Sequence, residues 1–158
     1  MKFKIEPTAD DALLNNCALM MSQSDPWIRL KRNLSGCREA MRGDDKEVYV
    51  AVEEGHLLGF IVLQMAGVFK GYIQSICVAP GRRGSGLGTS LISFAEKRIF
   101  SVSPNVFMLV SVFNENAARL YLRLGYEKIG VLKNFVVDGL DETLLRKTIG
   151  PLNGFPKS

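Results

Sequence analysis

The sequence predicts an α+β (α/β mixed) protein with one central mixed sheet of six to seven strands, mostly antiparallel, flanked by about four helices. First, the β-rich runs 47–52 and 57–65 are joined by a short turn, as in an antiparallel hairpin. Second, the order strand 69–78, helix 87–100 and strand 106–113 is typical of a parallel crossover. Third, 158 residues with 47% hydrophobic content suit one domain with a sizeable core.

The N-terminal third is predicted to contain one strand and two helices. Residues 3–5 form a short β-rich run. Residues 9–21 carry apolar side chains at helical spacing, which predicts the first helix. Behind it, Asp25 is a candidate cap and Pro26 a candidate first helical residue. We therefore expect the second helix to run from Pro26 toward Met41.

The C-terminal part is predicted to complete the sheet. A helix over about 116–124 is followed by the runs 126–137 and 143–147, which indicate the last two strands. The final segment is rich in breaker residues and is expected to lie on the surface. The predicted organisation is a single domain over 1–148 and a C-terminal tail over 149–158.

Composition and charge disfavour several classes of function. The net charge is +4, but the cations are spread along the chain, so a nucleic-acid partner is not expected. The absence of a signal core or a membrane-length apolar stretch predicts a cytoplasmic protein without a membrane partner. Three cysteines without C-x-x-C spacing, and a lone histidine, His56, in a turn, predict a reduced protein without a metal. The sequence leaves open whether the protein forms a homodimer.

The connection between the predicted strand 69–78 and the following helix is the most informative segment. It reads APGRRGSGLGT, from Ala79 to Thr89. A glycine-dense turn that leads from a strand into a helix presents backbone N–H groups to an anion, typically a phosphate. A P-loop is disfavoured because Leu87 stands where its lysine belongs, and the glycine spacing does not fit a dinucleotide fingerprint.

Two motifs carry a resemblance to a known family. The motif R-x-x-G-x-G, which begins at Arg83 and follows Val78-Ala79-Pro80, resembles the coenzyme A pyrophosphate loop of the GNAT superfamily of acetyl-CoA-dependent N-acyltransferases. The later segment NENAARLYLRLGY, from Asn114 to Tyr126, is similar to the family's second signature. The resemblance covers residues 3–148. It implies a GNAT-like sheet in which a parallel pair of strands splays apart.

This resemblance implies that acetyl-CoA is the cosubstrate. It also implies which residues contact the pantetheine arm, the thiolate and the pyrophosphate of that molecule. The backbone of Ile76, Cys77 and Val78 is expected to hold the pantetheine arm in the manner of an added strand, with the Cys77 side chain in the core and not a nucleophile. Asn114 is expected to orient the arm. Tyr121 is the expected general acid for the departing thiolate. The expected pyrophosphate ligands are Arg83, Gly84, Ser85, Gly86, Leu87, Gly88 and Thr89.

The sequence does not identify a general base. Members of the GNAT superfamily, which this chain resembles, often have a glutamate on the strand before the pyrophosphate loop, but residues 72–78 contain no acid. Three routes stay open. The first is a reaction without a dedicated base, in which binding the neutral amine close to the thioester suffices. The second is a water held by Gln74 or Ser75, and the third is a carboxylate from a loop, which would be Glu53, Glu54 or Asp138.

Two loops are expected to contact the acceptor. In the loop around 25–29, Trp27 is a candidate wall of an acceptor pocket, because its large ring combines apolar surface with one donor. In the connection 134–142, acidic side chains are candidates to attract a cationic amine. These acids are Asp138, Asp141 and Glu142.

The predicted function is an N-acetyltransferase that moves an acetyl group from acetyl-CoA to a primary amine by direct attack in a ternary complex. The acceptor is a small molecule, a peptide N-terminus or a lysine. A second interpretation, from another class, is a non-catalytic acyl-CoA-binding regulatory module, which the missing carboxylate leaves open. A basic nucleotide- or RNA-binding domain is the third interpretation, and it requires an affinity that collapses with salt.

Overall fold

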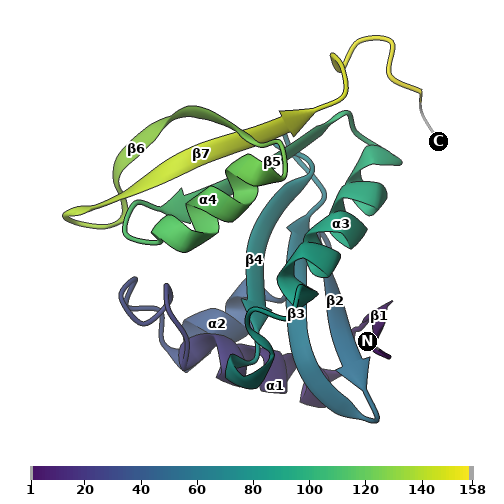
Figure 1. The fold of residues 1–158 in the computed structure, drawn as a ribbon, viewed down its shortest axis with the longest axis vertical. Coiled ribbons are helices and arrows are strands. Elements are labelled where there is room, and N and C mark those ends of the chain that lie inside the picture. The colour runs from purple at the N-terminus through teal and green to yellow at the C-terminus, as the bar shows by residue number, and fades with distance from the viewer. Residues whose placement is uncertain (1, 157–158) are drawn as a thin grey trace.

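One seven-stranded sheet organises the computed structural model, which describes residues 2–156. The strands lie in the order β1-β2-β3-β4-β5-β7-β6, and every neighbouring pair is antiparallel except β4 and β5 (Figure 1). The predicted mixed sheet and its four helices are confirmed. The strands are β1 (Lys4–Pro7), β2 (Lys46–Glu53), β3 (His56–Gln64), β4 (Tyr72–Val78), β5 (Asn105–Ser111), β6 (Glu127–Val137) and β7 (Leu140–Thr148).

The helices cover both faces of the sheet (Figure 1). On one face, α3 packs over a buried core that includes Leu91 and Val106. On the other face, α1 and α2 enclose a second core that includes Met21 and Phe60. Among the described residues, no helix is both long and apolar enough to cross a membrane. The helices are α1 (Asp11–Ser22), α2 (Leu34–Ala40), α3 (Leu87–Phe100) and α4 (Glu115–Arg123), with a 3₁₀ turn at Pro80–Arg82.

The first two helices begin at side-chain caps. The Asp10 carboxylate accepts a hydrogen bond of 2.8 Å from the Leu13 N–H and so starts α1. The Asn33 side chain accepts a hydrogen bond of 2.9 Å from the Gly36 N–H and so starts α2. The predicted helix over 9–21 is confirmed within two residues at its start and one at its end.

The prediction of a helix that begins at Pro26 was wrong over its first half. Residues 24–33 form turns, and Lys31 adopts the left-handed conformation with φ of 55°, through which no α-helix continues. The buried side chain of Trp27 anchors this segment in the core. The local signal that decides the helix start is Asn33, directly before α2, rather than the Asp-Pro pair.

Strand β4 begins later than predicted. A turn with a positive φ at Gly67 occupies the segment before it, and the strand starts at Tyr72 instead of residue 69. Phe69 lies outside the strand and packs edge-on against Phe107 of β5, with 5.1 Å between the ring centres. The aromatic character of this residue reflects a packing contact, not strand pairing.

Strand β7 begins earlier than predicted. It starts at Leu140 instead of residue 143 and pairs with β6, so most of the predicted connection 134–142 is a hairpin with a turn at Asp138 and Gly139. The longer strand has a functional consequence, because it brings Glu142 from a supposed loop into the sheet.

Strands β4 and β5 separate soon after they meet. The only residue pairs between them are Tyr72 with Phe107 and Ile73 with Met108. Beyond this point β4 pairs with β3 alone, as far as Val78. The parallel pair is confirmed, and its separation matches the expected splay. One edge of β4 is thereby left without a strand partner.

A charged network ties α3 to the last strand. Lys147 on β7 donates to both carboxylate oxygens of Glu96 on α3, at 3.0 Å each, and Tyr126 donates to the same carboxylate at 3.0 Å. The Lys147 ammonium also lies 5.7 Å from the centre of the Tyr126 ring. Because these bonds are charge-assisted, they fix the helix against the far half of the sheet.

Gly59→Ala is expected to lower the free energy of unfolding by about 1–3 kcal/mol. A Cβ at Gly59 would lie 2.7 Å from the backbone oxygen of Cys77 and 3.3 Å from the Cα of Val78, so β3 and β4 would have to move apart. Gly130→Ala is the control, because a Cβ there meets nothing within 4 Å. Urea unfolding measures both variants, and an equal loss at the two positions would contradict this close approach.

Candidate active site

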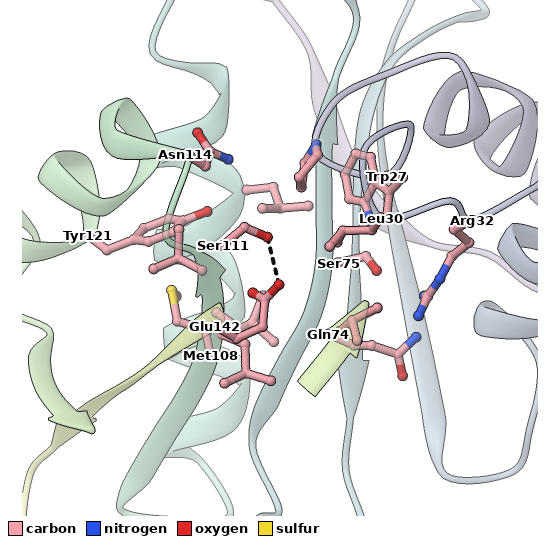
Figure 2. Close-up of a pocket in the computed structure, with 16 residues that line it drawn as sticks. Trp27, Leu30, Arg32, Gln74, Ser75, Met108, Ser111, Asn114, Tyr121 and Glu142 are labelled. Carbon is pink, nitrogen blue, oxygen red and sulfur yellow. Dashed lines mark hydrogen bonds between the residues drawn. The ribbon is translucent and has the colours of Figure 1, made fainter. Parts of the chain in front are cut away.

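A pocket lies where β4 and β5 separate. Its walls come from these two strands, from α4 and the residue before it, from the turns over 24–33 and from the β6–β7 hairpin. Figure 2 shows Tyr121 and Ser75 on opposite sides of this space, with Glu142 between them. The lining side chains that can donate or accept hydrogen bonds or protons include those of Trp27, Arg32, Ser75, Ser111, Tyr121 and Glu142.

Tyr121 presents its hydroxyl to this pocket from α4. The residue is only 8% exposed, and its ring stands edge-on to the Tyr126 ring with 6.2 Å between the ring centres. Its hydroxyl points toward the middle of the pocket in Figure 2. Burial raises the pKa of Tyr121 to about 12, because an apolar environment penalises the phenolate. The phenol is therefore protonated at neutral pH.

Asn114 lines the same pocket and precedes α4. Its side chain makes no capping hydrogen bond to the helix, although the residue occupies the cap position. Its backbone N–H donates to the Ser111 carbonyl at 2.8 Å, which fixes the turn between β5 and α4. The amide of Asn114 is thus available for a ligand. The structure brings Asn114 and Tyr121, two residues of one sequence motif, to one site.

Glu142 is the acid that the sequence did not single out as a base. The Glu142 residue is 3% exposed, and it lines the pocket from β7. The Ser111 hydroxyl, on the paired residue of β5, donates to Glu142 Oε1 at 2.8 Å (Figure 2). Burial raises the pKa of Glu142, and the hydrogen bond from Ser111 partly opposes this rise. A buried carboxyl of this kind binds a proton more readily than an exposed one.

A strand pattern in the sequence could have located Glu142. Leu140, Glu142 and Leu144 alternate, so they share one face of a strand, and an acid between two leucines on such a face is expected to be buried. The prediction that 134–142 is a connecting loop concealed this alternation. The candidate amine-attracting role of Glu142 remains compatible with its place in the pocket.

The other acids considered at the sequence level lie elsewhere. Glu53 forms an ion pair with Arg82 beside the glycine-rich turn. Glu54 is exposed in the β2–β3 turn, and Asp138 is exposed in the β6–β7 turn. Neither these three carboxylates nor Asp141 lines the pocket. The proposal that one of the three loop acids serves as the base is therefore not supported by the geometry.

Gln74 and Ser75 occupy the β4 wall of the pocket. The Gln74 amide donates to the Ala40 carbonyl at 2.7 Å and so ties β4 to α2. The Ser75 hydroxyl is buried and has no hydrogen-bond partner, and among the described residues it is the one buried side-chain polar atom in that situation. A buried hydroxyl without a partner costs free energy unless a water or ligand satisfies it.

The glycine-rich turn lies at the start of α3. Gly84 and Gly86 adopt the left-handed conformation, with φ of 73° and 85°, and Gly86 immediately precedes the helix. Within the described part of the chain, the backbone N–H groups of residues 84–89 donate to no acceptor. The Ser85 hydroxyl donates to the Arg82 carbonyl at 2.6 Å and steadies the turn. The result is a set of free donors at the positive end of a helix dipole.

Strand β4 connects this turn to the pocket. Ile76, Cys77 and Val78 pair with β3 on one side and have no strand partner on the other. The Arg83 guanidinium donates to the Val78 carbonyl at 3.4 Å, which holds the arginine near the end of the strand. Burial raises the pKa of the Cys77 thiol to about 11, so this cysteine is not a thiolate nucleophile.

The predicted acceptor loops have different outcomes. The segment that contains Trp27 does line the pocket, and the indole is 8% exposed. Asp141 does not face the pocket, because its carboxylate accepts a hydrogen bond of 3.1 Å from the Asn134 N–H within the hairpin. His56 is exposed at the start of β3, as expected for a turn residue.

Known proteins are similar to this chain in sequence and in fold. A model of the acetyltransferase (GNAT) family matches residues 14–126. An N-alpha-acetyltransferase of Sulfurisphaera tokodaii is 28% identical over 120 residues, which are 68% of this chain and 72% of that protein.

Two solved structures share the fold. The ribosomal-protein-S18-alanine N-acetyltransferase of Escherichia coli has a TM-score of 0.75 at 15% identity and covers 99% of both chains. An aminoglycoside 6'-N-acetyltransferase complexed with coenzyme A has a TM-score of 0.74 at 18% identity, over 94% of this chain and 98% of that chain. At such low identity, this likeness shows the fold alone.

Ser111→Ala is expected to raise the pKa of Glu142 further. The Ser111 hydroxyl stabilises the carboxylate form of Glu142. Without this hydrogen bond, desolvation by burial raises the pKa unopposed. Carboxyl carbon chemical shifts, followed by NMR across a pH titration, measure this pKa directly. Ser101→Ala at the end of α3 is the matched control and should leave the titration unchanged. A lower or equal pKa in Ser111→Ala would contradict the assigned contact.

Proposed function

The chain belongs to the acetyltransferase (GNAT) family and is an acyltransferase, and from this premise we propose that it transfers an acetyl group from acetyl-CoA to the α-amine of a polypeptide. The observation that carries the proposal is a single pocket faced by the protonated Tyr121 hydroxyl and the Glu142 carboxyl. Two groups able to move protons, beside an open strand edge, suit the attack of an amine on a thioester.

The glycine-rich turn is the proposed site of the coenzyme A pyrophosphate. Free N–H groups over 84–89, the positive end of α3 and the Arg83 guanidinium supply donors and charge for it. Coenzyme A is the ligand named for the aminoglycoside 6'-N-acetyltransferase structure with the same fold. The proposed ligands are the residues that the sequence predicted, Arg83, Gly84, Ser85, Gly86, Leu87, Gly88 and Thr89.

The open edge of β4 is the proposed site of the pantetheine arm. The Ala79 N–H donates to the Leu58 carbonyl, so alternate residues of β4 face β3, and the backbone groups of Ile76 and Val78 face the open edge on either side of Cys77. An extended amide-containing arm satisfies such groups as an added strand does. Asn114, whose amide is free of a capping bond, is proposed to orient the arm. An arm in this position carries the thioester toward Tyr121, on the far side of the opening.

The proposed proton transfers use the two buried groups. Glu142 accepts a proton from the acceptor ammonium, directly or through a water held by the unpartnered Ser75 hydroxyl. The neutral amine nitrogen then forms a bond to the acetyl carbon, and the carbon–sulfur bond breaks. Tyr121 donates a hydrogen bond to the departing sulfur and then its proton, and the extra proton on the newly acetylated nitrogen passes to the Tyr121 phenolate, which restores the phenol. The raised pKa values keep Tyr121 protonated and make Glu142 a stronger base.

A polypeptide acceptor is supported by the names of two similar proteins. One relative is an N-alpha-acetyltransferase, and one structural neighbour is a ribosomal-protein-S18-alanine N-acetyltransferase. The pocket suits the first residue of a chain, because Trp27 and Val136 supply apolar wall beside the acidic group. Small amines and lysine side chains are the competing acceptors that the assay below includes.

Tyr121→Phe and Glu142→Gln are each expected to lower kcat by about 10²- to 10⁴-fold, because each removes one proton transfer. Acetyl-CoA binding should persist in both variants. The assay follows free thiol and acetylated product with a panel of peptides, lysine derivatives and small amines. Tyr49→Phe is the matched control, because its hydroxyl bonds to Glu47, outside the pocket. Unchanged kcat in both pocket variants would refute the mechanism.

Gly86→Glu is expected to abolish acetyl-CoA binding. The substitution forces a side chain onto a left-handed residue with φ of 85° and adds negative charge beside the proposed pyrophosphate site. Calorimetry with acetyl-CoA measures the loss, and Gly130→Glu on β6 is the control that should bind normally. Wild-type protein that binds acetyl-CoA yet acetylates no amine would favour a regulatory module over an enzyme.

A further inference from the structure

Arg32 lies where the pocket opens onto the surface of α2. Its side chain lines the pocket that holds Tyr121 and Glu142, and it also lines a groove that runs along α2. Gln74 is the second residue common to both spaces. In Figure 2 the Arg32 guanidinium lies beside Gln74, at the edge of the pocket away from Tyr121. A chain that enters the pocket from α2 therefore passes Arg32.

The Arg32 guanidinium has no anionic partner among residues 2–156. No described carboxylate lies within 4.0 Å of it, whereas Arg82 and Arg98 form ion pairs with Glu53 and Glu47. The Arg32 residue is nevertheless half-buried. A guanidinium offers five N–H donors in a planar fork that matches a carboxylate, and a partly desolvated one gains most from such a partner.

Side chains of opposite charge type lie inside the pocket and at its edge. Glu142 is buried within it, and Arg32 is at its mouth. Burial raises the pKa of Tyr72 to about 12, with Glu142 adding to the rise and Arg32 opposing it, so both charges act on this one ring. This arrangement complements an acceptor with a cationic amine at its tip and a carboxylate a short way behind.

Beyond Arg32, the groove carries equal numbers of cationic and acidic side chains. It is lined by Arg42 and Lys46 together with the acids Glu39 and Asp45. Lys46 lies 3.7 Å from the Asp45 carboxylate, and Arg42 lies 3.7 Å from that of Asp11. These pairs reduce the charge available to a ligand. Arg32 is therefore the main receptor for an anion next to the pocket.

From these observations, and resting on the proposed function, we infer that the preferred acceptors are polypeptides with an aspartate or glutamate in the second to fourth position, whose carboxylate Arg32 binds. The N-terminal residue enters the pocket toward Glu142, and the chain leaves along α2. An extended chain rises about 3.3–3.6 Å per residue, so the acid must follow closely behind the amine to reach the mouth of the pocket.

Matched peptides test this inference with the full-length protein and acetyl-CoA. Each pair has the same sequence except for Glu or Gln, placed in turn at the second, third and fourth position. We expect kcat/KM to be about tenfold higher for the acidic member at one or more of these positions, the effect of one charge-assisted contact. The preference should decrease as ionic strength rises, because salt screens the charge.

Variants of Arg32 test whether this residue binds the acidic side chain of the acceptor peptide. Arg32→Gln should bring the Glu/Gln ratio of kcat/KM close to one, and Arg32→Glu should reverse the preference toward peptides with lysine at the same position. Arg123→Gln, on the exposed end of α4, is the control and should keep the wild-type ratio. Normal acetyl-CoA binding by calorimetry shows that the Arg32 variants are folded.

The outcomes separate this inference from the proposed function. Equal rates for acidic and neutral peptides would overturn the role of Arg32 and leave the acetyltransferase intact. A preference that survives in Arg32→Gln would also overturn it. Acetylation of no peptide at any position would overturn both the polypeptide acceptor and the acid preference.

Discussion

The early separation of β4 from β5 is the constraint on which the site depends. After two residue pairs the strands share no further pairing, so an unpaired strand edge runs through the interior of the sheet. Backbone groups in such a place need hydrogen-bond partners, and water or a ligand must provide them. The pocket opens at the same gap, and α3 begins close to the end of β4. The fold thus leaves one strand position for an extended polar molecule and brings the reactive side chains to its end.

The same apolar surroundings act on the two central groups in complementary ways. Burial disfavours charge on both, which keeps the Tyr121 phenol protonated and increases the affinity of the Glu142 carboxylate for a proton. The proposed proton donor and proton acceptor therefore have shifted pKa values without a charged neighbour. The hydrogen bond from Ser111 limits the effect on Glu142, so that the carboxylate form stays accessible. Environment, more than specific pairing, sets the acid–base chemistry proposed here.

The mixed sheet, its parallel pair and the local turns were predictable from the sequence, but segments whose conformation depends on distant packing were not. The turn at Gly84 and Gly86 and the helix after it follow from adjacent residues, because glycine spacing and apolar periodicity are local signals. The segment around Trp27 was misassigned, since its conformation comes from one indole buried in the core rather than from its own propensities. Glu142 and Arg32 were overlooked as a pair, because the pocket they line is assembled from opposite ends of the chain. No spacing rule relates residues so far apart.

The two halves of the site are built from separate stretches of chain. The proposed coenzyme side includes residues 76–89, whereas the proposed amine side includes the turns over 24–33 and the β6–β7 hairpin. The two sets meet in the core, where the Cys77 thiol donates to the Ser24 hydroxyl at 3.8 Å, so substitutions at exposed positions of the turns disturb the coenzyme side least. Such a division lets a few changes in the turns alter the acceptor, while the half proposed to hold the thioester keeps its sequence. The irregular segment that sequence propensity describes least well is thus the part of this protein most open to diversification.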